Sequence, residues 1–153
     1  MDIPELQRNA AAGSIVSQSV LGLSYLYGRD VQIDYHKAHE LLSLAAQRGA
    51  SRAVVNLGVM YEQGWGVPKN VQEAIRLYRS VSASEIRASL HLARIHAKGI
   101  GVPSDTAEAA KYYSAVASSE MTHDDAAGAA FTGTVTLQEV EEAKAYLARD
   151  SSP

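Results

Sequence analysis

The chain has 153 residues and a formal net charge of −3, from 14 basic and 17 acidic side chains. This length allows one domain or two small ones, and the lack of a basic excess argues against nucleic acid as a partner. The absence of cysteine excludes disulfides, thiol catalysis and thiolate metal sites. No apolar run approaches the roughly 18 residues of a membrane span, so membrane insertion is not expected. The start lacks the form of a secretory signal, which predicts a cytoplasmic chain, or a periplasmic one if a signal peptide was removed before this numbering.

An internal repeat of 35 or 36 residues dominates the sequence. Its clearest copy begins at Leu57, and the same residue types recur at Leu21 and at Leu92. Alanine is abundant, whereas phenylalanine and tryptophan each occur once, which is typical of closely packed helices and not of strands. A repeat of this length predicts stacked helical hairpins in one domain over residues 1–153.

The predicted elements follow this period along the chain. Residues 3–13 form a half repeat with a second helix only, and three repeats follow at 14–49, 50–84 and 85–119. The first helices of these repeats are expected at 14–27, 51–63 and 85–98, and the second helices at 35–48, 71–83 and 106–118. The remaining residues, 120–149, form a degenerate repeat, with a weak helix over His123–Phe131 and a capping helix over 137–149.

Glycines and capping residues mark the helix boundaries. Each first helix is predicted to end at a glycine that adopts a left-handed conformation, namely Gly28, Gly64 or Gly99. Each second helix is predicted to begin at an N-cap, namely Asp34, Asn70 or Asp105. A glutamate three residues after the cap predicts reciprocal capping boxes at Asn70–Glu73, Asp105–Glu108 and Thr136–Glu139.

The repeat resembles the Sel1-like repeat, a relative of the tetratricopeptide repeat. The resemblance rests on Leu-Gly-x-x-Tyr-x-x-Gly-x-Gly-Val-x-x-Asn-x-x-Glu-Ala-x-x-x-Tyr, as it stands from Leu57 to Tyr78. One departure is Asp30, which replaces the second loop glycine, so the loop of the first repeat is expected to bend differently. The resemblance implies an all-α fold, a right-handed α-solenoid of antiparallel helix hairpins, whose first helices line a concave face.

The tetratricopeptide geometry predicts which side chains of the first helices face a partner. The concave positions would include the apolar residues Leu23, Val59 and Leu90. In the third repeat this face would end in a basic stripe of Arg87, Arg94 and Lys98. Such a groove suits an acidic or mixed protein surface, because Tyr and Arg dominate binding hot spots. The predicted partner-binding residues are Tyr27, Arg52, Asn56, Glu62, Gln63, Trp65, Arg87, His91, Arg94 and Lys98. Two alternatives remain open: the basic side chains form an ordinary solvated helix face, and Trp65 packs within its loop instead of contacting a partner.

The sequence offers no chemistry of its own. His36 and His39 lie near each other on a predicted helix, but a third or fourth ligand for zinc is missing. The loop glycines belong to the repeat and do not form a phosphate-binding loop. We therefore expect no metal, no cofactor and no enzymatic activity.

The resemblance implies a non-catalytic scaffold that binds a cognate protein. Small bacterial Sel1-like proteins include immunity proteins that neutralise effector toxins, and this role is the leading specific hypothesis. An adaptor in bacterial signalling or envelope assembly is an alternative, and a module that binds a small ligand or glycan is a less favoured one. Homodimerisation through the ends of the solenoid is a further hypothesis, because Leu6 lies on an uncapped terminal helix.

Overall fold

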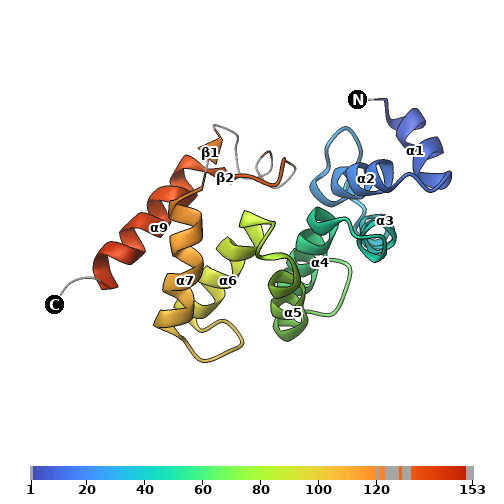
Figure 1. The fold of residues 1–153 in the computed structure, drawn as a ribbon. Helices are drawn as coiled ribbons and strands as arrows, with labels where there is room; N and C mark the ends of the chain where they lie inside the picture. Colours follow the sequence, from blue (N-terminus) through green and yellow to red (C-terminus); the bar gives the residue numbers. More distant parts are fainter. Residues whose placement is uncertain (1, 120, 123–127, 129–131, 151–153) are drawn as a thin grey trace. The chain divides into compact units, whose positions relative to one another are not determined.

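A computed structural model of the chain describes residues 2–119, 121–122, 128 and 132–150 (Figure 1). The chain divides into two compact units, residues 1–77 and 78–153. Each unit is built from helices that are joined by short loops, which confirms the predicted all-α fold class.

The first unit contains the half repeat and most of the first two repeats. Its helices are α1 (Ile3–Ala11), α2 (Ile15–Tyr27), α3 (Tyr35–Gln47) and α4 (Ser51–Gln63), and α5 (Val71–Val81) begins in it. Helix α2 packs against α1, α3 and α4. The predicted boundaries are confirmed to within two residues at every helix end of this unit.

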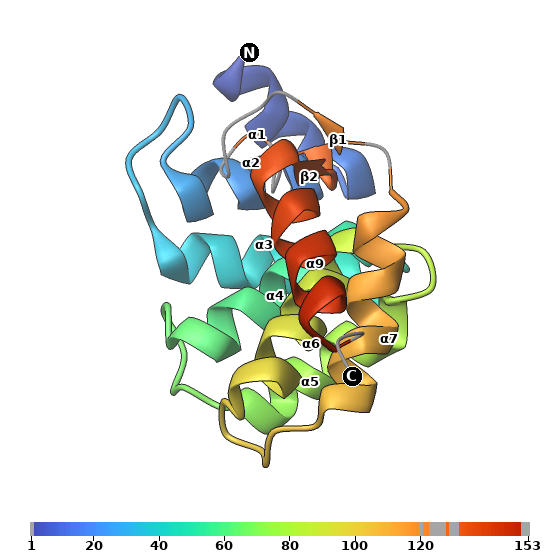
Figure 2. The same ribbon diagram turned by 90° about the vertical axis from the view of Figure 1, so that its left-hand side faces the viewer.

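The second unit contains α6 (Ile86–Lys98), α7 (Thr106–Ala117) and the C-terminal helix α9 (Leu137–Asp150). Helices α6 and α7 form a hairpin, and α9 lies alongside α7 (Figure 2). Two short strands, β1 (Met121–Thr122) and β2 (Val135–Thr136), pair in parallel before α9. The predicted helix over 137–149 is thus confirmed, and the strands were not predicted. The weak helix over His123–Phe131 falls almost entirely outside the described residues.

The second helices begin with the predicted caps but without the predicted reciprocal boxes. The side chains of Asp34, Asn70 and Asp105 each accept a backbone hydrogen bond from the third residue onward, at 3.0–3.1 Å. However, the backbone N–H of each cap donates to a carbonyl of the preceding helix, those of Tyr25, Tyr61 and His96. Because this N–H is already paired, the glutamate of the expected box is not needed, and Glu73 instead forms an ion pair with Arg76 at 2.6 Å.

The loop glycines adopt the expected left-handed conformation. Gly28, Gly64 and Gly99 close their helices with φ between +66° and +73°. Asp30 also has a positive φ, +60°, close to the +70° of Gly66 in the next repeat. The different bend expected for this loop was therefore wrong, because aspartate is among the residues that tolerate the left-handed region best.

Small residues allow the helices of a hairpin to approach closely. A Cβ atom added to Gly22 of α2 would lie 2.8 Å from Leu42 Cγ of α3. Ala38, Ala74 and Ala109, which share one position in the three repeats, have no exposed surface. His96 occupies the tyrosine position of the third repeat, and it packs there as a buried residue with its ring stacked on that of Tyr112.

Candidate protein-binding surface

Three apolar positions of the predicted concave face are buried in the structure. Leu23, Val59 and Leu90 have 1%, 7% and 0% of their surface exposed. The tetratricopeptide geometry was therefore wrong in predicting that these three side chains face a partner. Helix α2 packs directly against α4, so part of each of these two helices is covered by the other and cannot meet a partner.

The ten predicted binding residues separate into three groups by exposure. Three are exposed on the surface, namely Arg52, Gln63 and Lys98. Five are half-buried, namely Tyr27, Glu62, Trp65, His91 and Arg94. Two are buried, namely Asn56 and Arg87, and neither can serve as a surface contact in this conformation.

A chain of hydrogen bonds connects three of these residues in the first unit. The Tyr27 hydroxyl donates to Asn56 Oδ1 at 2.9 Å, and Asn56 Nδ2 donates to the Arg52 carbonyl at 2.8 Å. Asn56 is 2% exposed, so its amide is a fixed support for the half-buried tyrosine ring. We use the name α2–α4 face for Tyr27, Arg52, Glu62 and Gln63, with Asn56 as the buried support of Tyr27.

The two other aromatic candidates are held by ring stacking. Trp65 lies against Tyr35, with ring centroids 5.5 Å apart and ring planes 10° apart. His91 stacks on Tyr78 with a centroid distance of 4.8 Å. Trp65 is therefore a packing residue of its unit, and its half-buried ring leaves part of its surface to solvent.

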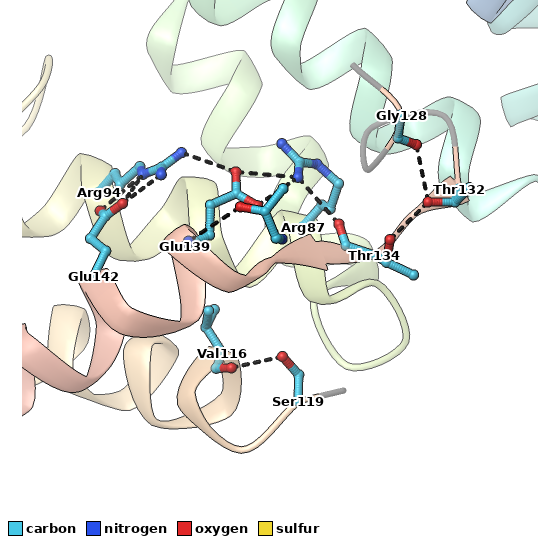
Figure 3. Close-up of polar contacts among 10 residues, drawn as sticks. Arg87, Arg94, Val116, Ser119, Gly128, Thr132, Thr134, Glu139 and Glu142 are labelled. Carbon is cyan, nitrogen blue, oxygen red and sulfur yellow. Dashed lines mark hydrogen bonds and ion pairs between the residues drawn. The ribbon is translucent and has the colours of Figure 1, made fainter. Parts of the chain in front are cut away.

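Arg87 forms a buried ion pair with the C-terminal helix (Figure 3). Its Nη1 lies 3.2 Å from Glu139 Oε2 and donates to the Thr134 carbonyl at 3.2 Å. Glu139 also accepts a hydrogen bond from the backbone N–H of Thr136, whose hydroxyl accepts one from the Glu139 N–H. This is the predicted reciprocal capping box, and one carboxylate both starts α9 and neutralises the buried arginine.

Arg94 forms a second ion pair with α9. Its guanidinium makes a bidentate contact with Glu142, at 3.0 Å from Nε to Oε1 and 2.5 Å from Nη2 to Oε2. The Tyr113 hydroxyl donates to the same carboxylate at 2.7 Å. These bonds to Arg94, followed by that to Tyr113, lower the pKa of Glu142 against the effect of burial.

These contacts change the expected effect of charge reversal at the basic stripe. A basic stripe that faces a partner predicts that the double variant Arg94→Glu, Lys98→Glu weakens partner binding and leaves the fold intact. Arg94 Nη1 lies 3.8 Å from Glu139 as well as contacting Glu142, so a glutamate at position 94 would face two carboxylates. That variant is expected to loosen α9, and it is unsuitable as a binding test.

We predict that Glu142 stabilises the fold in a pH-dependent way. Folding lowers the pKa of Glu142 below its ordinary value of 4.5. The stability that Glu142 contributes is therefore fully present above pH 4.5, and it is lost as the pH falls through the lower pKa of the folded state. Urea denaturation of the wild type and of Glu142→Gln, between pH 7 and about pH 3, measures this. The wild type should be more stable at neutral pH, and the difference should shrink on acidification. A difference that does not change with pH would contradict the assignment.

The described residues show neither a metal cluster nor a membrane span. Among them, no group of three or more His, Cys, Asp or Glu side chains lies close enough together to hold a metal ion. In the same part of the chain, no helix combines the length and apolar character needed to cross a membrane.

Curated proteins with matching sequences are much longer than this chain. DAP3-binding cell death enhancer 1 of Rattus norvegicus is 34% identical over 88 residues, which are 54% of this chain and 17% of that protein. The ERAD-associated E3 ubiquitin-protein ligase component HRD3B of Arabidopsis thaliana is 33% identical over 81 residues, 53% of this chain and 13% of that protein. The chain thus spans less than a fifth of these relatives.

Solved structures match over nearly the whole chain. A Sel1 repeat protein from Oxalobacter formigenes is 31% identical with a TM-score of 0.65, and the match covers 97% of this chain and 98% of that one. A protective antigen of uropathogenic Escherichia coli, c5321, shares the fold with a TM-score of 0.70 at 24% identity, covering 99% of this chain and 34% of that one. The family model of the Sel1 repeat matches residues 15–49, 51–81 and 86–119. Three successive repeats therefore account for most of the chain, which belongs to the Sel1 repeat family.

Proposed function

We propose that the chain is a non-catalytic scaffold that binds one cognate protein through the α2–α4 face, with Arg52 receiving an acidic group of the partner. The main support for this proposal is a comparison of two repeats of the same chain. Arg52 and Arg87 are each the second residue of a first helix, α4 and α6, and they occupy the same position of the repeat. At that position in the third repeat, Arg87 holds the Glu139 carboxylate and the Thr134 carbonyl of the chain's own tail.

The α2–α4 face has further features of a binding surface. The Tyr27 ring is fixed by its hydrogen bond to the buried Asn56, so little side-chain entropy would be lost when a partner packs on it. An exposed ion pair at Arg52 alone would contribute little, and the tyrosine supplies the apolar contact that hot spots require. Val16, at the corresponding position of the first repeat, is 72% exposed and adds an apolar group on α2.

The named relatives support a role in protein assembly. One is named for binding DAP3 and others as components of a ubiquitin ligase. More specifically, we propose that this chain is an immunity protein that neutralises a bacterial effector toxin. It would do so in the cytoplasm, or in the periplasm if a leader is removed. Its support is the resemblance of the repeats to small bacterial Sel1-like proteins, together with the fold shared with two bacterial structures.

Affinity capture with matched variants tests the proposal. The wild type, Arg52→Glu and Arg79→Glu are used as baits in lysate of the source organism. Arg79 is an exposed arginine of α5 and controls for the change of charge. We expect one protein to be recovered near 1:1 by the wild type and by Arg79→Glu, and to be lost with Arg52→Glu. Recovery of the same proteins by all three baits, or of this chain alone, would contradict a partner on the α2–α4 face.

The immunity role needs a separate measurement. The captured protein is expressed alone, and then together with the wild type or with Arg52→Glu. Growth arrest by the captured protein, relieved by the wild type but not by Arg52→Glu, is the expected result. A captured protein that leaves growth unchanged would contradict the toxin proposal, and it would leave the scaffold proposal intact.

A further inference from the structure

A concave pocket of about 370 Å³ lies between α1, α2 and α3, apart from the α2–α4 face. Half of its lining residues are aliphatic, namely Ala10 and Ala11 from α1, Leu21 from α2, and Leu41 and Leu44 from α3. Leu44 is 41% exposed, one of four large apolar side chains with this much exposure among the described residues. The pocket therefore presents apolar surface that the unit itself does not cover.

Two polar groups in the pocket wall retain unused hydrogen-bonding capacity. Gln18 is 5% exposed; its Nε2 donates to the Ala10 carbonyl, while its Oε1 has no partner among the described residues. Leaving such a buried acceptor unpaired is unfavourable. The Tyr25 hydroxyl accepts a hydrogen bond from Gln7 Nε2 at 3.2 Å and can still donate its own proton. The wall thus offers one acceptor and one donor.

The charge around the pocket argues for a neutral occupant. Lys37 and Glu40 of α3 are its charged lining residues, so they contribute no net charge. Lys37 is also engaged with Asp34 at 3.3 Å and lies over the Tyr25 ring. A carboxylate or an ammonium group would therefore gain little, whereas an amide offers an N–H for Gln18 and a carbonyl for Tyr25.

We propose that this pocket is a second binding site, which receives a leucine-like aliphatic side chain of a protein partner together with the adjacent peptide amide. The aliphatic walls bury the side chain, and the peptide N–H donates to Gln18 Oε1. This site does not depend on the α2–α4 face, since it uses different residues of α2 and none of α4. A partner that occupies both surfaces gains avidity without any new contact.

The variant Gln18→Met separates ligand binding from folding. It removes the unpaired oxygen and keeps a side chain of similar size, and the Ala10 carbonyl still accepts a hydrogen bond from the Gly13 N–H. The free energy of unfolding should therefore stay equal or increase. A residue with a merely structural role would instead lower it when replaced. Gln47→Met, at an exposed position at the end of α3, is the matched control.

The test is an NMR titration of the full chain with N-acetyl-L-leucine N′-methylamide, which carries the side chain and both amides. Binding of so small a probe is expected in the millimolar range, with shifts on α1, α2 and α3. The analogue with both amide nitrogens methylated should bind about tenfold more weakly, as should the parent probe to Gln18→Met, while Gln47→Met should bind like the wild type. Equal binding of the two probes, unchanged binding to Gln18→Met, shifts confined to other helices, or no saturable shift would each overturn the proposal.

Discussion

Replacing Arg87 with methionine is expected to lower the free energy of unfolding by about 3–5 kcal/mol. Arg87 and Glu139 are both more than nine-tenths buried, so the substitution leaves a buried carboxylate whose one remaining ion pair, to Arg94 Nη1, is longer, at 3.8 Å. The same change releases the Thr134 carbonyl and the start of α9. Urea denaturation at neutral pH, followed by the helical circular dichroism of the chain, measures the loss, and part of this signal should disappear at lower urea than in the wild type.

Two further variants show whether the ion pair is the cause. Glu139→Gln, added to Arg87→Met, removes the buried charge and keeps an oxygen that accepts the Thr136 N–H. It should restore a large part of the lost stability, because replacing both partners of a buried pair is far less costly than replacing one. Arg79→Met, at an exposed position, should change stability by less than about 0.5 kcal/mol. An Arg87→Met variant as stable as Arg79→Met would show that the pair does not hold α9.

The substitution Gly66→Ala is expected to lower the free energy of unfolding by about 2–5 kcal/mol. Two costs combine at this position. Gly66 has a φ of +70°, which costs alanine about 1–2 kcal/mol. The added Cβ would lie 2.7 Å from Tyr35 Cβ and 3.1 Å from its carbonyl oxygen, and such overpacking costs about 1–3 kcal/mol. Trp65, the only tryptophan, stacks on the same tyrosine, so its fluorescence reports the disturbance directly.

Gly49 provides the matched control for this prediction. Its φ is +89°, but a Cβ added there would meet no atom within 4 Å. Gly49→Ala should therefore show only the conformational cost, about 1–2 kcal/mol, and should leave the Trp65 fluorescence unchanged. If the two alanine variants lose the same free energy of unfolding, the close contact between Gly66 and Tyr35 at the start of α3 does not contribute to the loss.

The repeat made much of the fold predictable from the sequence. A glycine that ends a helix, an Asp or Asn that starts one, and alanine at the hairpin contact each act locally, so the helix boundaries came out within one or two residues. The short strands β1 and β2 have no such signal, because two residues are too few for an alternating pattern. The reciprocal capping boxes failed at Glu73 and Glu108 because a carbonyl of the preceding helix had already paired the cap N–H.

The candidate site was predictable only in part. The face assigned to a partner came from the geometry of a related repeat and not from these residues. One signal was present in the sequence: the repeat position of Arg94 holds Leu23 and Val59 in the earlier repeats, and two apolar residues at one position indicate a covered surface. Glu139 and Glu142 in the tail were the complementary charges. No local pattern reveals that a helix more than 40 residues later returns to cover these arginines.

The most direct test asks whether Arg52 contacts the partner while Arg87 is held by the chain's own α9. It measures the reactivity of the two arginines toward phenylglyoxal by mass spectrometry, in the free chain and in complex with the captured partner. In the free chain, Arg52 is expected to react readily and Arg87 to be protected by Glu139 and α9. In the complex, Arg52 should become protected, while Arg87 should not change. Equal reactivity of the two arginines in the free chain, or an Arg52 that stays reactive in the complex, would contradict the account.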